Sequence, residues 1–202
     1  GGSIANNDPA ACYPAAVLGL GATVITNKRE IAADDYFLGM FTTALEEDEI
    51  VTGVRFPAPQ KANYQKFVQP ASRFALTGVF AALTASGPRV AVTGASEEGV
   101  FRWTEAEQAL ASSWSPDAIE PLSPPPADHM ISDIHGSQEY RAHLAKVLTK
   151  RAVAAAAGRP ASAASLLRRP GPRPGRSRIG AAKACFLVRP ERQRGQGINR
   201  LT

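Results

Sequence analysis

The chain has 202 residues, of which 44% are hydrophobic, and this length and composition exclude disorder throughout the chain. It contains no apolar run long enough for a membrane-spanning helix. It begins at Gly1 without a secretory signal, which predicts a chain cut at its amino end. Cys12 and Cys185 have no second Cys or His at metal-ligand spacing, so we expect neither a structural disulfide nor a zinc site. A cytoplasmic location fits this use of cysteine.

The formal net charge of +5 is divided between two unlike segments. Residues 159–202 carry eleven Lys or Arg side chains and one Glu, whereas residues 1–158 carry twelve Lys or Arg and seventeen Asp or Glu. The basic segment is rich in Pro and Gly and lacks the interleaved aromatic side chains that stack on bases. We therefore expect a disordered tail, the product of a shifted reading frame, with no role in binding nucleic acid.

The opening run Gly1-Gly2-Ser3-Ile4-Ala5-Asn6-Asn7-Asp8-Pro9 carries the strongest functional signal. Paired glycines followed by small polar residues let backbone N–H groups close on a phosphate, because no Cβ holds the ligand away. Gly-Gly-Ser is also an ordinary flexible linker, so the run by itself leaves both interpretations open.

Residues 14–20 have the pattern of a short apolar helix, and residues 21–26 and 29–31 that of short strands. Asp34 and Asp35 precede what we expect to be one helical turn, where acids suit the positive end of the helix dipole. Residues 50–56 predict a strand that stops at Pro57-Ala58-Pro59, and we place a domain boundary there, between residues 58 and 59.

Residues 64–68, 75–85 and 89–93 predict the antiparallel strands of a second domain, with a turn at Ser86-Gly87-Pro88. Three later segments have the chemistry of helix starts. Thr104 and Glu107 have the spacing of a capping box, Ser115 precedes Pro116, and Ser137 opens a longer helix.

No set of residues has the pattern of a nucleophile with its base and acid, so the sequence predicts no catalytic residue. His135 and His143 are eight residues apart with a helix start between them, which is poor geometry for a shared metal ion. We therefore expect no metal site.

The ordered series of short motifs resembles that of a known family. The motifs are Gly1-Gly2-Ser3, Asn6-Asn7-Asp8-Pro9-Ala10-Ala11, Tyr13-Pro14-Ala15-Ala16, Gly21-Ala22-Thr23-Val24, Glu49-Ile50-Val51, Val54-Arg55-Phe56-Pro57, Tyr64-Gln65-Lys66-Phe67, Pro70-Ala71-Ser72-Arg73-Phe74-Ala75, Val90-Ala91-Val92-Thr93-Gly94-Ala95, Phe101-Arg102, and the run from Ser132 to Arg141. Together they are similar to the FAD-binding medium subunit of molybdenum hydroxylases, which include carbon monoxide, aldehyde and xanthine dehydrogenases. The resemblance extends from Gly1 to about Gly158.

The resemblance implies an α+β fold of two domains. Residues 1–58 would be the second half of a two-part FAD-binding domain, and residues 59–158 a small domain with a three-stranded antiparallel sheet and helices. Gly1, Gly2 and Ser3 would grip the pyrophosphate of FAD, with Asn6 as a side-chain donor. Val51 would lie near the adenine, and Phe74 would lie beside the isoalloxazine ring or else in the core.

The family also implies an electron-transfer subunit of an oxidoreductase. Its partners would be a large subunit with the molybdenum cofactor and a small subunit with [2Fe-2S] clusters, in a heterotrimer that dimerises into a hexamer. FAD would pass electrons from the clusters to an external acceptor. The family pattern has an acid where this sequence has Cys12, and it has a first subdomain with its own Gly-rich loop that this sequence lacks. We therefore expect this chain to bind FAD weakly or not at all and to be inactive alone.

Two alternatives remain at this point. The chain could belong to a flavin oxidase on a related FAD-binding fold, for which the second domain is the discriminating feature. It could also be a fragment without enzymatic activity whose arginine-rich tail binds nucleic acid, which salt-dependent retention on DNA would reveal.

Overall fold

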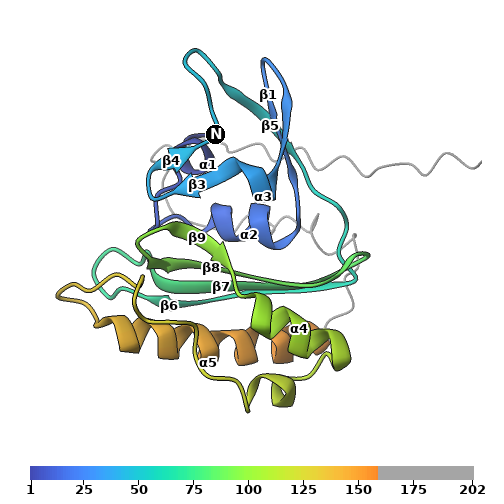
Figure 1. Ribbon diagram of the computed structural model, residues 1–202, viewed down its shortest axis with the longest axis vertical. Helices are drawn as coiled ribbons and strands as arrows, with labels where there is room; N and C mark the ends of the chain where they lie inside the picture. The colour runs from blue at the N-terminus through green and yellow to red at the C-terminus, as the bar shows by residue number, and fades with distance from the viewer. Residues whose placement is uncertain (159–202) are drawn as a thin grey trace, which may run out of the picture.

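The computed structural model describes residues 1–158. The basic tail of residues 159–202, which we expect to be disordered, lies outside these residues. The described part consists of a four-stranded sheet with helices on both faces and a smaller three-stranded sheet above it (Figure 1). None of its helices has the length and apolarity that crossing a membrane requires.

The first part of the chain folds into short elements, as expected. Its helices are α1 (Gly2–Asn6), α2 (Tyr13–Gly19) and α3 (Ala33–Tyr36), and its strands are β1 (Thr23–Thr26), β2 (Glu30–Ala32), β3 (Phe37–Gly39), β4 (Thr42–Thr43) and β5 (Val51–Arg55). Strands β2, β1 and β5 form an antiparallel sheet in that order, and β3 pairs with β4. The opening segment, expected to be a loop, forms the short helix α1 instead.

The second part has one strand more than the three expected. Strands β6 (Lys61–Val68), β7 (Ala75–Thr84), β8 (Gly87–Ser96) and β9 (Gly99–Arg102) form an antiparallel sheet in that order. The short β9 was missed because its four residues, which follow β8 after Glu97 and Glu98, are too few to show the alternation of a strand. The predicted β7–β8 hairpin is confirmed, although Gly87 already pairs with Thr84, which puts the turn one residue earlier.

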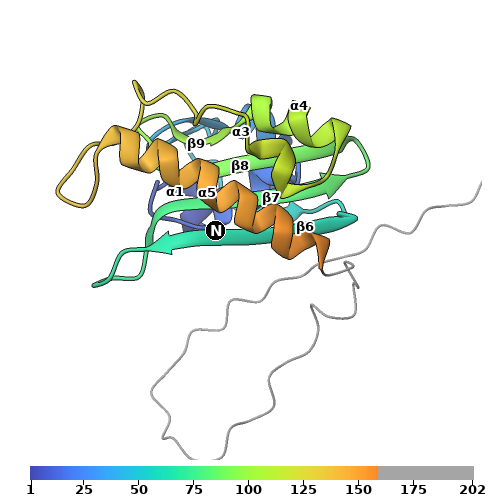
Figure 2. The ribbon, with the colours of Figure 1, turned by 90° about the horizontal axis from the view of Figure 1, so that it is seen from below.

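Helices α4 (Thr104–Ser112) and α5 (Gln138–Ala157) cover one face of this sheet, together with the 3-10 helix η1 (Pro116–Ile119); Figure 2 shows α5 crossing the strands. The Ser115 and Ser137 hydroxyls cap η1 and α5 by accepting from the N–H groups of Asp117 and Tyr140, as predicted. The predicted capping box at Thr104 is wrong, because α4 begins after Trp103 without a side-chain cap. The Glu107 carboxylate instead accepts from the N–H of Val90 and the guanidinium of Arg102.

The other face of the four-stranded sheet packs against the first part of the chain. Ala91 and Val100 of this sheet share a buried cluster with residues of the first part, which are Ile4, Ala15, Val17, Leu18, Ala22, Val24, Ile31, Ala33 and Tyr36. Gly19, at the end of α2, lies so close to the sheet that a Cβ would be 2.7 Å from Cδ1 of Phe80 and 3.3 Å from Cβ of Ala91. The absence of a side chain at Gly19 therefore sets how closely α2 approaches the sheet.

Gly19→Ala is expected to lower the free energy of unfolding by about 1–2 kcal/mol, because the added methyl group overpacks this contact. Denaturant unfolding measures the change. Gly158→Ala is the matched control, since a Cβ at Gly158 meets nothing within 4 Å among residues 1–158 and should cost no stability. Equal stability of Gly19→Ala and the unchanged chain would contradict the packing argument.

Candidate functional site

The opening segment presents three exposed residues at the start of a helix. Helix α1 begins after Gly1, whose carbonyl oxygen accepts from the N–H groups of Ile4 and Ala5 at 3.0 Å each. The first N–H groups of a helix have no acceptor within it, and they point outward from its start. Gly1, Gly2 and Ser3 are exposed, whereas Ile4 anchors the segment in the core.

The two glycines of this segment are not required by the packing of the described residues. Within the described part of the chain, a Cβ built on Gly2 meets nothing within 4 Å, and one built on Gly1 would lie 3.8 Å from the backbone oxygen of Val51. Gly1 and Val51, which are fifty residues apart in sequence, are therefore neighbours. Space lies open over Gly2, where a ligand can approach the backbone without meeting a side chain.

Asn6 and Asn7 at the end of α1 have different environments. Asn6 is exposed, and its role as a donor to the phosphates stays a prediction. Asn7 is 1% exposed and adopts the left-handed conformation, with φ 45° and ψ 43°. Its side-chain amide donates to the carbonyl oxygen of Gly39 at 2.6 Å, which fixes the β3–β4 pair beside α1. The sequence analysis missed this role, although Asn is the non-glycine residue best suited to such a helix end.

Cys12 lies half-buried at the start of α2, facing the second part of the chain. Its Sγ is 3.6 Å from Nζ of Lys66, which also donates to the carbonyl oxygen of Arg73 at 3.0 Å. Burial is the main cause that raises the pKa of the Tyr64 hydroxyl, and the nearby Cys12 thiol raises it further. The thiol thus contacts β6 side chains, and its role in binding a nucleotide stays a prediction.

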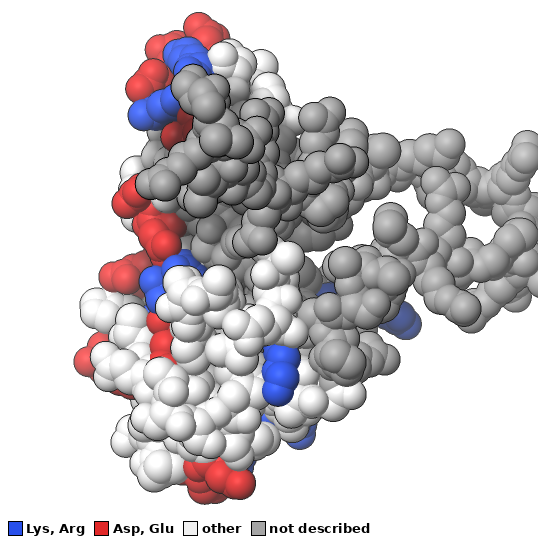
Figure 3. All heavy atoms as spheres, turned by 90° about the vertical axis from the view of Figure 1, so that its right-hand side faces the viewer, with Lys and Arg blue, Asp and Glu red and all other residues white. Residues whose placement is uncertain are grey.

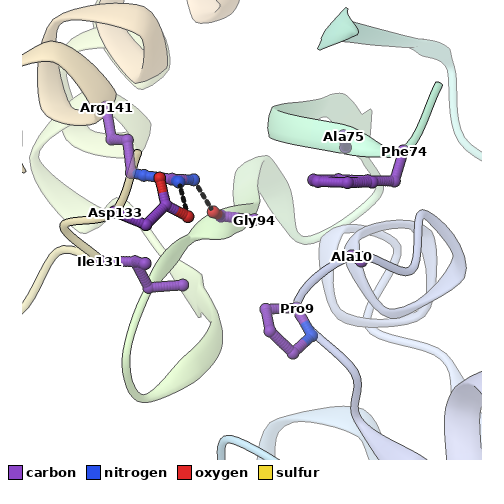
Figure 4. Close-up of a pocket in the computed structure, with 8 residues that line it drawn as sticks. All are labelled: Pro9, Ala10, Phe74, Ala75, Gly94, Ile131, Asp133 and Arg141. Atoms are coloured by element: carbon purple, nitrogen blue, oxygen red, sulfur yellow. Dashed lines mark hydrogen bonds and ion pairs between the residues drawn. The ribbon is translucent and has the colours of Figure 1, made fainter. Parts of the chain in front are cut away.

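Phe74 lies at the start of β7, half-buried, beside a cavity of about 120 Å³. Figure 4 shows its ring across the cavity from Arg141 and Asp133, with Pro9 and Ala10 on a third side. The Thr93 hydroxyl can donate to the carbonyl oxygens of Pro9 at 3.2 Å and Ala11 at 3.0 Å, which ties this segment to β8. The cavity therefore forms where the segment after α1 meets the sheet.

The predicted site residues fall into two groups. The first group is Gly1, Gly2, Ser3 and Val51, at the start of α1. The second group is Cys12 and Phe74, which are linked by Lys66: its amine contacts Cys12 and also the carbonyl oxygen of Arg73, the residue before Phe74. The segment from Asn6 to Cys12 connects the groups along the chain. The sequence analysis gave no site role to Arg141 and Asp133, whose charges line the cavity. Among residues 1–158, no cluster of three or more His, Cys, Asp or Glu side chains could hold a metal ion.

A buried carboxylate holds the loop that leads into β5 and Val51. The Glu49 side chain has no exposed surface, and the guanidinium of Arg29 donates to it at 3.1 Å. This guanidinium, the N–H of Glu46 and the Thr26 hydroxyl lower the pKa of Glu49 to about 2. Figure 3 shows the charged side chains gathered at this upper end of the molecule, where Lys28 and Arg29 also pair with Glu46.

The free energy of unfolding is expected to fall as the pH drops from about 5 to about 2, in part because of Glu49. Its pKa is lower in the folded chain, so the unfolded chain takes up the proton first and the stabilisation is lost on acidification. In Glu49→Gln the chain should be less stable at pH 7, and this deficit should shrink towards pH 2. Denaturant unfolding at several pH values measures it, with the exposed Glu97→Gln as control. A deficit independent of pH would contradict the assignment.

Comparisons with known proteins agree with this geometry. Residues 1–59 match the family model described as the FAD binding domain in molybdopterin dehydrogenase. The chain is 36% identical over 172 residues to the nicotine 6-hydroxylase medium subunit of Paenarthrobacter nicotinovorans, covering 79% of this chain and 60% of that protein. It is 32% identical over 170 residues to the glyceraldehyde dehydrogenase medium chain of Sulfolobus acidocaldarius, covering 75% of this chain and 59% of the relative.

Solved structures give the same result. The reconstituted CO dehydrogenase from Oligotropha carboxidovorans matches with a TM-score of 0.69 and 29% identity, over 79% of this chain and 60% of that one. Quinoline 2-oxidoreductase from Pseudomonas putida 86 matches with a TM-score of 0.63 and 28% identity, over 78% of this chain and 60% of that one. The chain is homologous to the FAD-binding medium subunits of the molybdenum hydroxylases. The mixed helix-and-strand fold with antiparallel sheets is the expected one.

The chain spans about 60% of the length of the relatives that it matches. These relatives are subunits of hydroxylase and dehydrogenase complexes. The residues of this chain fit the cofactor that the family implies. The N–H groups at the start of α1 and the open space over Gly2 suit a diphosphate, and the ring of Phe74 beside a cavity suits a flat aromatic ring.

Proposed function

We propose that this chain is the FAD-binding part of the medium subunit of a molybdenum-containing hydroxylase or dehydrogenase. The carrying observation is the match of residues 1–59 to the FAD-binding domain family, together with the open space over the exposed Gly2. Bound FAD would supply the redox chemistry, taking electrons from iron–sulfur clusters and passing them to an external acceptor. The protein would contribute binding and orientation, and no catalytic residue is assigned.

The proposed binding mode uses the two groups of residues described above. Gly1, Gly2 and Ser3 would donate backbone N–H groups to the pyrophosphate, with the exposed Asn6 amide as a further donor. The backbone of Val51, which lies next to Gly1, would contact the adenine end of FAD. Cys12 would stand near a ribose hydroxyl in place of the family's acid. Phe74 would lie towards the flavin end, where its ring would exclude water from one side of the isoalloxazine.

The proposed partners are those that the family implies. They are a large subunit with the molybdenum cofactor and a small subunit with [2Fe-2S] clusters, assembled as a heterotrimer that dimerises into a hexamer. The relatives are named as a medium subunit and a medium chain, which supports a complex of several subunits. The cytoplasmic location stays a prediction.

Gly2→Ala separates FAD binding from folding. We expect the affinity for FAD to fall at least about five-fold, because a Cβ would hold a phosphate oxygen away from the N–H groups of α1. The melting temperature should not fall, since that Cβ meets no described residue and alanine favours a helix. Quenching of flavin fluorescence on titrating the 202-residue chain into FAD measures the affinity.

Gly158→Ala is the matched control, because it adds a methyl group in open space at the end of α5, far along the chain from Gly2. It should leave both FAD affinity and melting temperature unchanged. If Gly2→Ala binds FAD as the unchanged chain does, the opening segment does not contact the cofactor. If the unchanged chain gives no saturable quenching even at millimolar concentration, the proposed cofactor is wrong for this chain.

A further inference from the structure

Arg141 is a buried arginine in the first turn of α5, where only 3% of its surface is exposed. One guanidinium nitrogen, Nη1, donates to the carbonyl oxygens of Leu76 at 2.7 Å and Gly94 at 2.8 Å. The other, Nη2, donates to Oδ2 of Asp133 at 2.7 Å. Burying a guanidinium is costly unless it is paired, so these contacts specify its position closely.

The backbone around Arg141 explains why a guanidinium lies there. The β7–β8 ladder ends at the pair Gly78–Thr93, so the carbonyl groups of Leu76 and Gly94 lie beyond it. Gly94 has φ +79°, and a Cβ there would be 2.5 Å from the oxygen of Ala75. The two strands are thus held together beyond the ladder by a side chain that donates to both carbonyls. This point is only two residues from Phe74.

Asp133 extends the contact from Arg141 to the aromatic ring of Phe74. Its Oδ1 accepts from the N–H of His135 at 2.9 Å, and the bridge between Asp133 and Gly136 closes this loop. The ring of His135 packs edge-on against Phe74, with ring centroids 6.3 Å apart. Burial opposes ionisation of Asp133, but the His135 N–H and the Arg141 guanidinium outweigh it and lower its pKa.

These contacts end at the cavity beside Phe74. Arg141 and Asp133 line its charged side, and Pro9, Ala10, Ala75 and Ile131 give it apolar walls (Figure 4). Nε of Arg141 is buried and has no hydrogen-bond partner among the described residues. The β7 strand begins directly after Phe74, and the 131–136 loop contacts Phe74 through His135. One guanidinium therefore holds both segments.

We propose that Arg141, through Asp133 and His135, positions the ring of Phe74 at the cavity for packing against a flavin ring. The flavin side of this inference rests on the proposed function. Arg141 contacts Leu76, which lies two residues after Phe74, and Asp133 orients His135, whose ring contacts Phe74. The three are positioning residues, since they act through Phe74.

The first test needs no flavin. In the 202-residue chain, NMR cross-relaxation between the ring protons of Phe74 and His135 should be lost in Asp133→Asn. Glu120→Gln is the matched control, because Glu120 also pairs with a basic residue of α5, Lys150, at the other end of the helix. That control should keep the signal. Retention of the signal in Asp133→Asn would overturn the positioning role.

The second test is a double-mutant cycle on FAD affinity. As a single substitution, Asp133→Asn should weaken FAD binding about three- to ten-fold. Added to Phe74→Leu, it should cause no further loss, because its effect acts through the Phe74 ring. Equal losses in both backgrounds would show a merely structural role and would overturn the inference. If circular dichroism shows that Asp133→Asn does not fold, His135→Ala takes its place in the cycle, since it leaves the ion pair between Arg141 and Asp133 intact. The same criterion then decides.

The two tests separate failure of the inference from failure of the proposed function. If the unchanged chain does not bind FAD, the proposed function fails, and the NMR signal still decides whether Asp133 positions Phe74. If FAD binds but the cycle shows no coupling, the proposed function stands and the positioning role fails.

Discussion

The packing of α2 against the four-stranded sheet is the constraint on which the rest of the structure depends. Strands β7 to β9 bury one face under α4 and α5 and the other under the first part of the chain. Gly19 permits the close approach of α2, because any side chain there would meet Phe80. The first part has only short strands and helices, and Ala91 and Val100 of the sheet complete its buried cluster. The start of α1 therefore takes its position relative to Phe74 from this contact.

Charged side chains stabilise the edge of the contact between the first part of the chain and the four-stranded sheet. Arg89 on β8 donates to the carbonyl oxygen of Leu18 and to the Asp34 carboxylate at 2.6 Å. Arg102 on β9 lies 3.3 Å from the same carboxylate and pairs with Glu107 on α4. The hydrogen bond to Glu107 is the main cause that raises the pKa of Arg102. Hydrogen bonds to carbonyl groups require a particular orientation, whereas apolar packing by itself does not. They therefore fix one arrangement of the first part of the chain against the sheet.

Sequence patterns predicted those features that depend on neighbours along the chain. The helix starts at Ser115 and Ser137 were correct because each hydroxyl caps an N–H only two or three residues away. The same rule failed at Thr104, because Glu107 bonds to Val90 and Arg102. Asn7 and Arg141 donate to carbonyl groups more than thirty residues away, at Gly39 and at Leu76 and Gly94, and no spacing rule could assign these contacts. The site residues implied by the resemblance stay predictions, of which the structure brings Gly1 and Val51 together.

The sequence by itself determined most of the longer helices and strands, the proline-rich passage between β5 and β6, and the family to which the motifs point. These features follow from local patterns of apolar residues, helix caps and turns. Only the tertiary structure decided that the sheet has a fourth strand, that both its faces are buried, and that the charges of Arg141 and Asp133 face Phe74 across a cavity. The physical reason is that these features depend on contacts between distant segments, which form together when apolar surface and buried polar groups find their partners.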